Sequence, residues 1–450
     1  MSYLKKLAVA SAVLSVCLAP MSTAIAATVD DLGKSLTPIG AERAGNAAGT
    51  IPEWKGGIVE PVAGWTRGSA RVDPYASDAK LFTIDASNVD QYKGELSDGQ
   101  IALITKYPGY RMDVYPSRRS CGYSQRIYDR TKANVAEAKL AEDGTILSGY
   151  GGFFFPLPKT GWEAMINHRT AYQGTAVEQT SSMAVVQGSG NYVLNVGEMR
   201  IYSPHFDPKI TSFADTRGYM GKLVYSQLEP VSAVGSVLLT VSAFNAGNES
   251  WVYIPGLRRV KKAPQAVYDN PVPGQDNLRT FDQTFMFNGQ GDRYDWKLVG
   301  KKEMYVAYNA AKFKQAGVKI SDIVQKNYPN RDLTRYELHR VWVVEATVKA
   351  SQRNLFAKRI FYLDEDTWTA VAADLYDGKG ELWRVEENHL FVAPELPACV
   401  TAADFYYDLN ANRYIADNLV VDPKKENYRA EDVVTNDMFQ PDSLRRLGKR

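Results

Sequence analysis

The sequence is poor in histidine and cysteine and has no excess of charge of either sign. Its 450 residues include 4 His and 3 Cys, and 53 Lys and Arg stand against 51 Asp and Glu. No pair of histidines has the spacing of a metal site and no Cys-x-x-Cys occurs, so we expect neither a metal centre nor another cofactor. The balanced charge argues against a nucleic acid or an anionic membrane surface as the main partner, because both need a strong basic excess.

The usual signatures of catalysis are missing too. The sequence has no G-x-S-x-G nucleophile elbow, no G-x-G-x-x-G before a helix and no P-loop. Gly188-Ser189-Gly190 is better explained as part of a hairpin turn. A carboxylate pair such as Asp364 and Asp366 is compatible with a hydrolase, but acidic residues at this spacing are typical of turns.

Long apolar runs are absent beyond the N-terminus. Lys5 and Lys6 precede an apolar run from Leu7 to Leu18, and Ala24-Ile25-Ala26 follows. This layout predicts a signal peptide over residues 1–26, cleaved after Ala26. The run is shorter than the roughly 20 residues of a membrane helix, so we expect an exported periplasmic protein, with association to the outer membrane as a further expectation. The mature chain then carries no net charge, because the two lysines are lost with the peptide.

Cysteine chemistry leaves one question open. Lipoprotein processing at Cys17 is disfavoured, because Val16 stands where a small residue is needed. Cys121 and Cys399 remain after cleavage. They either form a disulfide, which would contribute about 5 kcal/mol through its long loop, or stay as two buried thiols.

The first part of the mature chain, residues 27–182, has mixed signals. Ser97 and Gln100 form a capping box that predicts a helix ending before Pro108. Residues 110–116 are typical of a short strand, and residues 124–141 of a longer helix.

From residue 183 to 423 the apolar pattern has mostly a period of two, which predicts an antiparallel sheet. Helices are expected as inserts at 303–316 and 320–326, and a polar C-terminal tail at 424–450 is expected to end in a frayed helix. We therefore predict one large domain over 27–423, mainly β with helical inserts (α+β), built on a large curved antiparallel sheet that forms an incomplete barrel. The expected strands cover residues 183–186, 192–196, 237–243, 251–262, 342–348, 355–363, 368–376, 381–392 and 404–421.

Aromatic side chains on these strands are the positive anomaly. They pack a sheet core or line the concave wall of a hydrophobic ligand cavity. His389 shares the face of one of them and is interpreted as a hydrogen-bonded core histidine. The cavity candidates are Trp251, Tyr253, Trp342, Val344, Trp383 and Phe391.

Residues 293–304 form a second anomaly, because charges alternate with aromatic side chains. Alternation would place the aromatic residues on one face and the charges on the other. The charged face is either solvated or a patch that docks a partner. The residues of this candidate partner patch are Arg293, Asp295, Trp296, Lys297, Lys301 and Lys302.

Several motifs together resemble a known family. LTPIGAERAGNAAGTIPEWKGG, LSDGQIALITKYPGYRMDVYPSRR, FPLPKTGWEAMINH, RTFDQTFMFNGQGDRYDWKLVGKKEMY and RYELHRVWVVEA followed by KRIFYLDEDTW closely resemble the secreted proteobacterial family called domain of unknown function 1329. ESWVYIPGLRRVKKAP is similar to the corresponding part of the outer-membrane lipoprotein-sorting (Lol-type) carriers. The resemblance implies an incomplete barrel that holds acyl chains without covalent chemistry, and it implies an inner-membrane exporter and an outer-membrane protein as partners.

The sequence therefore favours a non-enzymatic periplasmic carrier or accessory protein for a lipid-like or otherwise hydrophobic molecule. One alternative is an envelope hydrolase on lipids or glycans that uses Glu163, Asn167 and His168; the other is a structural scaffold with filled sheet faces. Residues 36–57, which we call the strap, carry Glu42, Asn46 and Trp54. Their irregular, glycine-rich sequence predicts a lid over a cavity or an ordered strap that only packs.

Overall fold

The computed structural model describes residues 27–264, 266, 268–419 and 433–448. The predicted signal peptide lies outside these residues. Within them, one sheet of fifteen strands dominates, and β3 (Lys139–Leu140) and β4 (Ile146–Ser148) form a separate pair. None of the helices that are described has the length and apolar character needed to cross a membrane.

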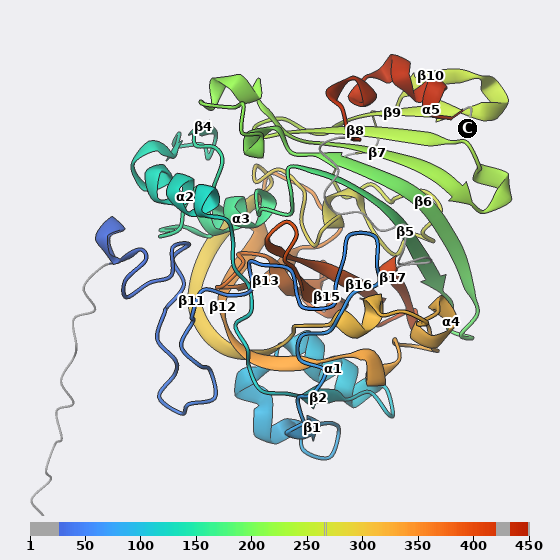
Figure 1. Cartoon of the computed structure of the whole chain (residues 1–450). Coiled ribbons are helices and arrows are strands. Elements are labelled where there is room, and N and C mark those ends of the chain that lie inside the picture. Colours follow the sequence, from blue (N-terminus) through green and yellow to red (C-terminus); the bar gives the residue numbers. More distant parts are fainter. Residues whose placement is uncertain (1–26, 265, 267, 420–432, 449–450) are drawn as a thin grey trace, which may run out of the picture.

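The large sheet bends back on itself without closing, so the prediction of a curved, mainly β, incompletely closed sheet is confirmed. Figure 1 shows β5 to β10 as one arm above the other arm, which β11 to β17 form. Strand β17 pairs with β5 and joins the two arms. Between the described strands of the large sheet, the pairings are antiparallel except for a parallel bridge between β2 and β12. The strand order is β1-β2-β12-β13-β14-β15-β16-β17-β5-β6-β7-β8-β9-β10, with β11 on the side of β12.

The bounds of the remaining elements follow from the hydrogen-bond pattern. The strands are β1 (Phe82–Ile84), β2 (Met112–Val114), β5 (Ala176–Val186), β6 (Tyr192–Tyr202), β7 (Tyr219–Glu229), β8 (Val237–Ala243), β9 (Glu249–Ile254), β10 (Arg259–Lys262), β11 (Tyr294–Ala307), β12 (Tyr336–Val348), β13 (Lys358–Asp364), β14 (Ala370–Tyr376), β15 (Leu382–Ala393), β16 (Ala398–Asp408) and β17 (Arg413–Leu419). The α-helices are α1 (Asp98–Lys106), α2 (Gln125–Glu137), α3 (Gly161–Arg169), α4 (Ile320–Ile323) and α5 (Leu444–Leu447).

Local signals explain several of these elements. The Ser97 hydroxyl accepts the Gln100 amide N–H at 3.0 Å, and the Gln100 side chain accepts the Ser97 N–H at 3.0 Å, so the capping box starts α1 as predicted. Helix α2 ends four residues before the predicted bound, because the chain leaves it to form β3. In β12, Val344 and Ala346 are buried on one face while Thr347 is exposed on the other, as the period of two predicts.

The predicted helix at 303–316 is wrong. Residues 303–307 form the second half of β11, which pairs with β12 along its whole length, and a short 3₁₀ helix follows at Ala311–Lys314. Met304 and Val306 are buried in this ladder. The pairing with β12 therefore overrides the helix-forming composition of this stretch. Of the helix expected at 320–326, the single turn α4 forms.

The described part of the C-terminal tail is packed and not frayed. Val434, Phe439, Leu444 and Leu447 are buried in one cluster with the apolar face of β8, while residues 424–432 and 449–450 lie outside the described part. The C-terminal tail therefore covers this face of the sheet.

Strand β5 begins at Ala176, so this part of the sheet starts before the predicted bound at residue 183.

Side chains fill the space inside the bend of the sheet. One continuous cluster of buried apolar residues joins Ile39 and Ile51 of the strap to Phe361 of β13 and Leu375 of β14. A second cluster on the other face of β12 includes Val341 and both cysteines. The strap is thus part of the same packed body as the sheet.

Candidate functional site

The strap is anchored by buried hydrogen bonds at both of its ends. Trp368 donates its indole N–H to the Ile39 carbonyl at 2.9 Å, and Trp54 donates its own to the Cys121 carbonyl at 3.0 Å. Gly40 has φ +95°, and a Cβ at this position would lie 1.9 Å from the Pro156 carbonyl oxygen. Because only glycine fits there, the path of the strap against the body is fixed by its sequence.

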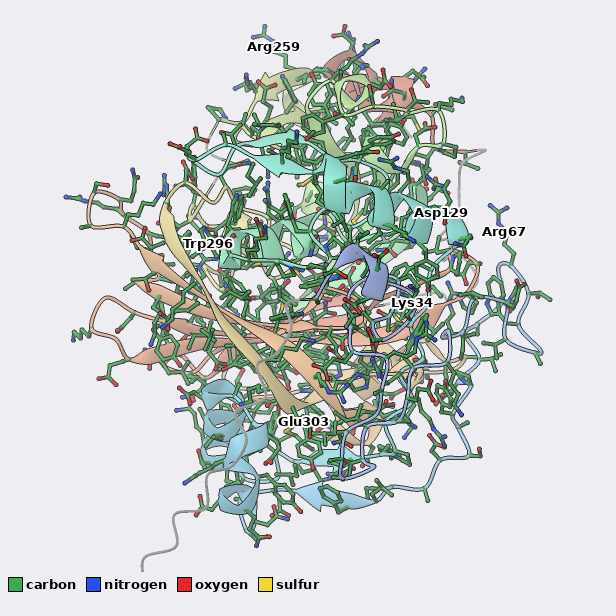
Figure 2. All side chains as sticks on the ribbon, turned by 90° about the vertical axis from the view of Figure 1, so that its left-hand side faces the viewer. Lys34, Arg67, Asp129, Arg259, Trp296 and Glu303 are labelled. Carbon is green, nitrogen blue, oxygen red and sulfur yellow. A yellow bond between two sulfur atoms is a disulfide. The ribbon has the colours of Figure 1, made fainter. Side chains whose placement is uncertain are left out.

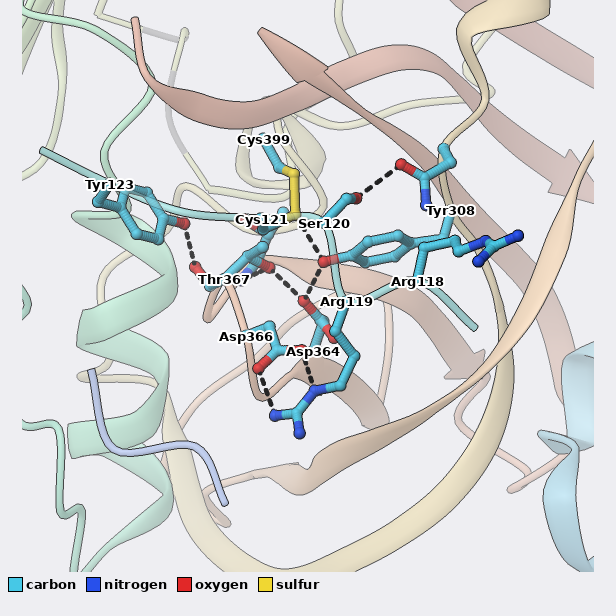
Figure 3. Close-up of a disulfide and its surroundings, with 12 residues drawn as sticks. Arg118, Arg119, Ser120, Cys121, Tyr123, Tyr308, Asp364, Asp366, Thr367 and Cys399 are labelled. Atoms are coloured by element: carbon cyan, nitrogen blue, oxygen red, sulfur yellow. Dashed lines mark hydrogen bonds and ion pairs between the residues drawn. A yellow bond between two sulfur atoms is a disulfide. The ribbon is translucent and has the colours of Figure 1, made fainter. Parts of the chain in front are cut away.

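Arg119 connects the strap to the acidic turn after β13. Its guanidinium donates to both carboxylate oxygens of Asp366, at 2.8 and 2.7 Å, and to the carbonyls of Glu42 at 2.7 Å and Arg43 at 3.1 Å. Figure 3 shows the paired arrangement of Arg119 and Asp366. The side chains of both residues are 1% exposed. A buried, bidentate ion pair thus holds the strap onto the sheet.

Opposing effects set the pKa values in this cluster. Burial lowers the pKa of Arg119, but the hydrogen bond and charge of Asp366 outweigh burial and leave the pKa above its ordinary value. Burial raises the pKa of Asp364 and Glu365. For Glu42 burial also raises the pKa, but the positive charges of Lys301 and then Arg340 lower it further, so the net shift is downward.

His339 completes the cluster as a cation. Its Nε2 lies 3.2 Å from Glu337 Oε2, and its Nδ1 lies 3.4 Å from Asp364 Oδ1. Burial lowers its pKa, but the hydrogen bonds to Asp364 and Glu337 raise it to about 9.

His339, Asp364 and Asp366 offer ligand atoms within 4.8 Å of one another, which is the spacing of a metal site. Protonated His339 has no lone pair for a metal, however, and Arg119 already occupies both oxygens of Asp366. The arrangement is therefore better described as an ionic clamp, by which we mean Arg119, His339, Glu337, Asp364 and Asp366.

We expect the clamp to lose stability in alkaline solution. The pKa of His339 is about 9 against an ordinary 6.5, so its contribution is complete below about pH 6.5 and is lost as the pH rises through 9. The difference in the free energy of unfolding between the wild type and His339→Gln should shrink by about 3 kcal/mol between about pH 6 and pH 10. Guanidinium unfolding at several pH values measures it.

His205→Gln is the matched control, because burial lowers the pKa of His205 to about 4 and the residue stays neutral throughout this range. Its difference from the wild type should not shrink: it should rise by less than about 1 kcal/mol up to about pH 7.5, where the unfolded histidine loses its proton, and stay constant above that. A difference for His339→Gln that does not shrink either would show that His339 is not a cation in the fold.

Cys121 and Cys399 form a disulfide beside the clamp. Cys121 follows Arg119 by two residues, and Cys399 lies at the start of β16. Figure 3 shows the bond above Asp364 and Asp366, with the Tyr308 hydroxyl next to Cys121. Of the two alternatives that the sequence leaves open, the structure has the disulfide.

A cleft of about 790 Å³ lies next to the C-terminal end of the strap, where Trp54 and Gly56 line it. Its walls are the end of the strap with the following loop, the chain around the start of α2, and the loop between β15 and β16. Tyr128 meets Trp54 edge to face with ring centroids 6.5 Å apart. Most of the residues that line the cleft are apolar, aromatic or glycine. The full set is Trp54, Gly56, Val59, Glu60, Pro61, Trp65, Arg67, Gly68, Arg71, Tyr123, Ser124, Gln125, Tyr128, Pro394, Glu395 and Pro397.

Six of the sixteen residues that line the cleft are polar: Glu60, Arg67, Arg71, Ser124, Gln125 and Glu395. Arg71 and Glu395 form an ion pair at 2.5 Å with side chains 7% and 12% exposed, and the Arg71 guanidinium stacks over the Trp65 ring at 5.1 Å. The buried indole nitrogen of Trp65 has no hydrogen-bond acceptor among the residues that the structure describes. The cleft therefore combines aromatic, proline and valine side chains with polar and charged ones.

The six predicted cavity residues lie elsewhere. Val344, Phe391 and Tyr253 are buried. Trp342 stacks on Trp368 with centroids 6.0 Å apart. Trp251 packs in the cluster that the C-terminal tail covers.

Trp383 packs against Phe356 and lines a second depression, of about 510 Å³, together with Asp377, Asp408, Asn410 and Ala411. We call the first cleft, of about 790 Å³, the aromatic cleft. None of the six residues lines it, whereas Trp54 of the strap does.

The structure divides the predicted patch on β11 into two parts. Asp295 and Lys297 are exposed, while Trp296 packs on Trp162 with centroids 5.2 Å apart. Arg293 stacks over Tyr268 at 3.6 Å.

Lys301 and Lys302 of this patch contact the N-terminal part of the chain. Lys301 donates to Glu42 at 3.2 Å and to Glu365 at 3.0 Å, and Lys302 donates to the Leu96 carbonyl at 2.8 Å. Asn46 of the strap donates to Glu303 at 2.9 Å. The second half of the patch therefore contacts the strap and the start of α1.

The residues considered for hydrolysis have structural contacts in α3. His168 Nε2 lies 2.9 Å from the Phe285 carbonyl, its Nδ1 accepts the Ala370 N–H at 3.0 Å, and burial lowers its pKa to about 4. Asn167 bonds the backbone of Phe155 in both directions. Glu163 accepts the Lys159 N–H. Both ring nitrogens of His168 are used by the backbone, so it has none left for a substrate.

The comparisons with known proteins establish the family. The model of the family described as protein of unknown function (DUF1329) matches residues 83–445. The chain belongs to this family, which confirms what its motifs indicate. It is 39% identical over 432 residues to uncharacterized protein PA3922 of Pseudomonas aeruginosa, and the alignment covers 93% of each chain.

Two solved structures are similar over nearly their whole length. A DUF1329 family protein of Desulfovibrio piger aligns with a TM-score of 0.43 and 12% identity, covering 63% of this chain and 97% of that one. The LolA superfamily protein NE2245 of Nitrosomonas europaea aligns with a TM-score of 0.38 and 10% identity, covering 63% and 99%.

Proposed function

We propose that this protein binds a lipid-like or otherwise hydrophobic molecule in the aromatic cleft, without chemical conversion, as a periplasmic carrier or accessory protein in envelope transport. The observation that carries the proposal is the cleft itself, which has the size of a small-molecule site and is lined by four aromatic, three proline and one valine side chain beside six polar ones. The N-terminal 26 residues, with their charged start and apolar run, support export.

The cleft suits an amphiphile better than a pure hydrocarbon. Rings of Trp54, Trp65, Tyr123 and Tyr128 offer apolar faces to a chain or a ring system. The polar side chains of Ser124 and Gln125 also line the cleft and are hydrogen-bonding groups for the polar end of such a ligand.

The strap acts in this proposal as a fixed wall and not as a hinged lid. Its hydrogen bonds to Trp368 and Arg119 and its buried Ile39 and Ile51 hold it against the body, while Trp54 presents its ring to the cleft. Cargo therefore enters through the open side of the cleft.

An inner-membrane exporter and an outer-membrane protein are part of the same proposal as partners. The exposed charges Asp295 and Lys297 at the start of β11 are the part of the predicted docking patch that remains accessible.

The test is ligand uptake by the purified mature protein. We expect organic extracts of the protein to contain a lipid-like compound by mass spectrometry, and a fluorescent fatty acid to bind. Trp65→Ala and Tyr128→Ala should each weaken its binding by about tenfold, because each removes an aromatic wall of the cleft.

Trp251→Ala is the matched control, since Trp251 packs under the C-terminal tail and lines no part of the cleft. It should leave binding unchanged. Loss of binding in Trp251→Ala or Trp342→Ala, with none in Trp65→Ala, would instead place the ligand on the sheet faces and reject the cleft.

A structural scaffold is the second candidate function. It is favoured by the side chains that fill the inside of the sheet from the strap to β14. The same experiment separates the two, because a scaffold would yield no extractable compound and would ignore the fatty acid probe.

A further inference from the structure

Two turns lie together at the outer end of the arm formed by β5 to β10. One joins β7 to β8, and the other joins β9 to β10. They touch, because a Cβ added to Gly235 of the first would lie 3.3 Å from Pro255 of the second. We call four exposed apolar side chains at this place the apolar tip; they are Leu228 near the end of β7, and Val231, Val234 and Leu257 on the turns.

The apolar tip is unusually exposed. Val231 has 89% of its surface in solvent, and the other three side chains have 45–51%. The backbone bonds of the first turn, from Ala233 to Pro230 and from Ser236 to Ala233, do not depend on the side chain at 231. The fold therefore does not require valine at position 231, and a polar residue would form the same turn. Exposing the apolar side chain to water is unfavourable in free energy.

Basic side chains lie beside the apolar tip, on the second turn and β10. Arg258 and Arg259 follow Leu257 directly, and Lys261 is exposed further along β10. Lys262 is paired with Glu249 at 2.6 Å, and the acidic residue beside Leu228 is Glu229. Figure 2 shows Arg259 at the outer margin of the molecule, directed away from the ribbon.

Edge protection explains only part of this pattern. Strand β10 is the last strand of the sheet, and lysine or arginine on an edge strand discourages pairing with another chain. Protection would be served equally well by polar turns. The combination of apolar side chains at the extreme end with arginines beside them is typical of a surface that inserts shallowly into a lipid headgroup layer.

We propose that the apolar tip and its basic neighbours dock this protein onto an anionic phospholipid surface. The four apolar side chains enter the headgroup region, and Arg258, Arg259 and Lys261 contact lipid phosphates. The neutral overall charge of the mature chain does not oppose this, because screening limits the attraction to charges within about 10 Å of the surface. The local excess at the tip is basic.

The experiment is sedimentation of the mature protein with vesicles of phosphatidylcholine containing about 30% phosphatidylglycerol, compared with vesicles of phosphatidylcholine alone. We expect binding to the anionic vesicles, weakened by high salt. Val231→Ser with Leu257→Ser should lower the partition coefficient about tenfold, and Arg258→Glu with Arg259→Glu should lower it at least as much.

Leu147→Ser is the matched control, because Leu147 is 55% exposed on β4, away from the tip; it should change nothing. Fatty acid uptake by the cleft should be unaffected in all these variants, so the docking and cleft proposals fail separately. Two results would overturn the docking proposal. One is no sedimentation with anionic vesicles; the other is a dimer in analytical ultracentrifugation that Val231→Ser abolishes, which would make the tip a contact between copies of the chain.

Discussion

Arg119→Met should lower the free energy of unfolding by about 3–5 kcal/mol. The substitution keeps the length of the side chain but leaves the Asp366 carboxylate buried without its partner, and buried pairs are most costly when only one member is removed. It also leaves the Glu42 and Arg43 carbonyls of the strap without their donor. Guanidinium unfolding followed by tryptophan fluorescence measures the loss.

Arg118→Met is the matched control at the neighbouring position. Its guanidinium pairs with Asp78, but its side chain is 40% exposed, so we expect a loss of no more than about 1 kcal/mol. Adding Asp366→Asn to Arg119→Met should restore part of the stability, because it removes the unpaired charge. Equal losses for the two arginines would mean that the clamp does not secure the strap.

Replacing Cys121 and Cys399 by alanine should lower the free energy of unfolding by about 5 kcal/mol. The bond closes a loop of 278 residues, and the entropy that a cross-link removes from the unfolded chain grows with the length of the loop. We expect the wild type in reducing buffer to unfold at the same denaturant concentration as the variant in either buffer.

The reductant itself supplies the control, since the variant should not respond to it. Free thiols must be counted in the same samples, because a bond 1–2% exposed at both cysteines is shielded from small reductants in the folded state. A wild type that has two free thiols and yet keeps its full stability would contradict the prediction.

The parts of the fold that the sequence predicts are those that local chemistry decides. The capping box at Ser97 acts within one helical turn, and the alternation of Trp342, Val344 and Ala346 reflects one face of one strand. The second half of β11 could not be predicted in this way. Lys, Glu, Met and Ala favour a helix, and the strand forms because β12, some 30 residues further on, supplies a matching ladder.

The site was harder to predict for the same reason. The local sequence marks Asp366 as an ordinary turn residue, because its partner Arg119 stands 247 residues earlier. The one available signal was the density of charge in SRRSC and LDEDTW, which a period-two pattern does not explain. Trp54 was selected from the strap, whereas Trp65 and Tyr128 carry no motif. Only folding brings together the three segments that line the cleft, which are residues 54–71, 123–128 and 394–397.

The pairing of β17 with β5 has a consequence for how the molecule assembles. Val185 and Val186 of β5 pair with Ile415 and Tyr414, so the arm from β5 to β10 has an open inner edge until nearly the whole chain is available. Contacts this distant in sequence form slowly and expose unpaired strands in the meantime. The order of synthesis therefore makes β5 the segment most in need of protection by a chaperone, and a chain cut before residue 414 would keep that edge open to aggregation.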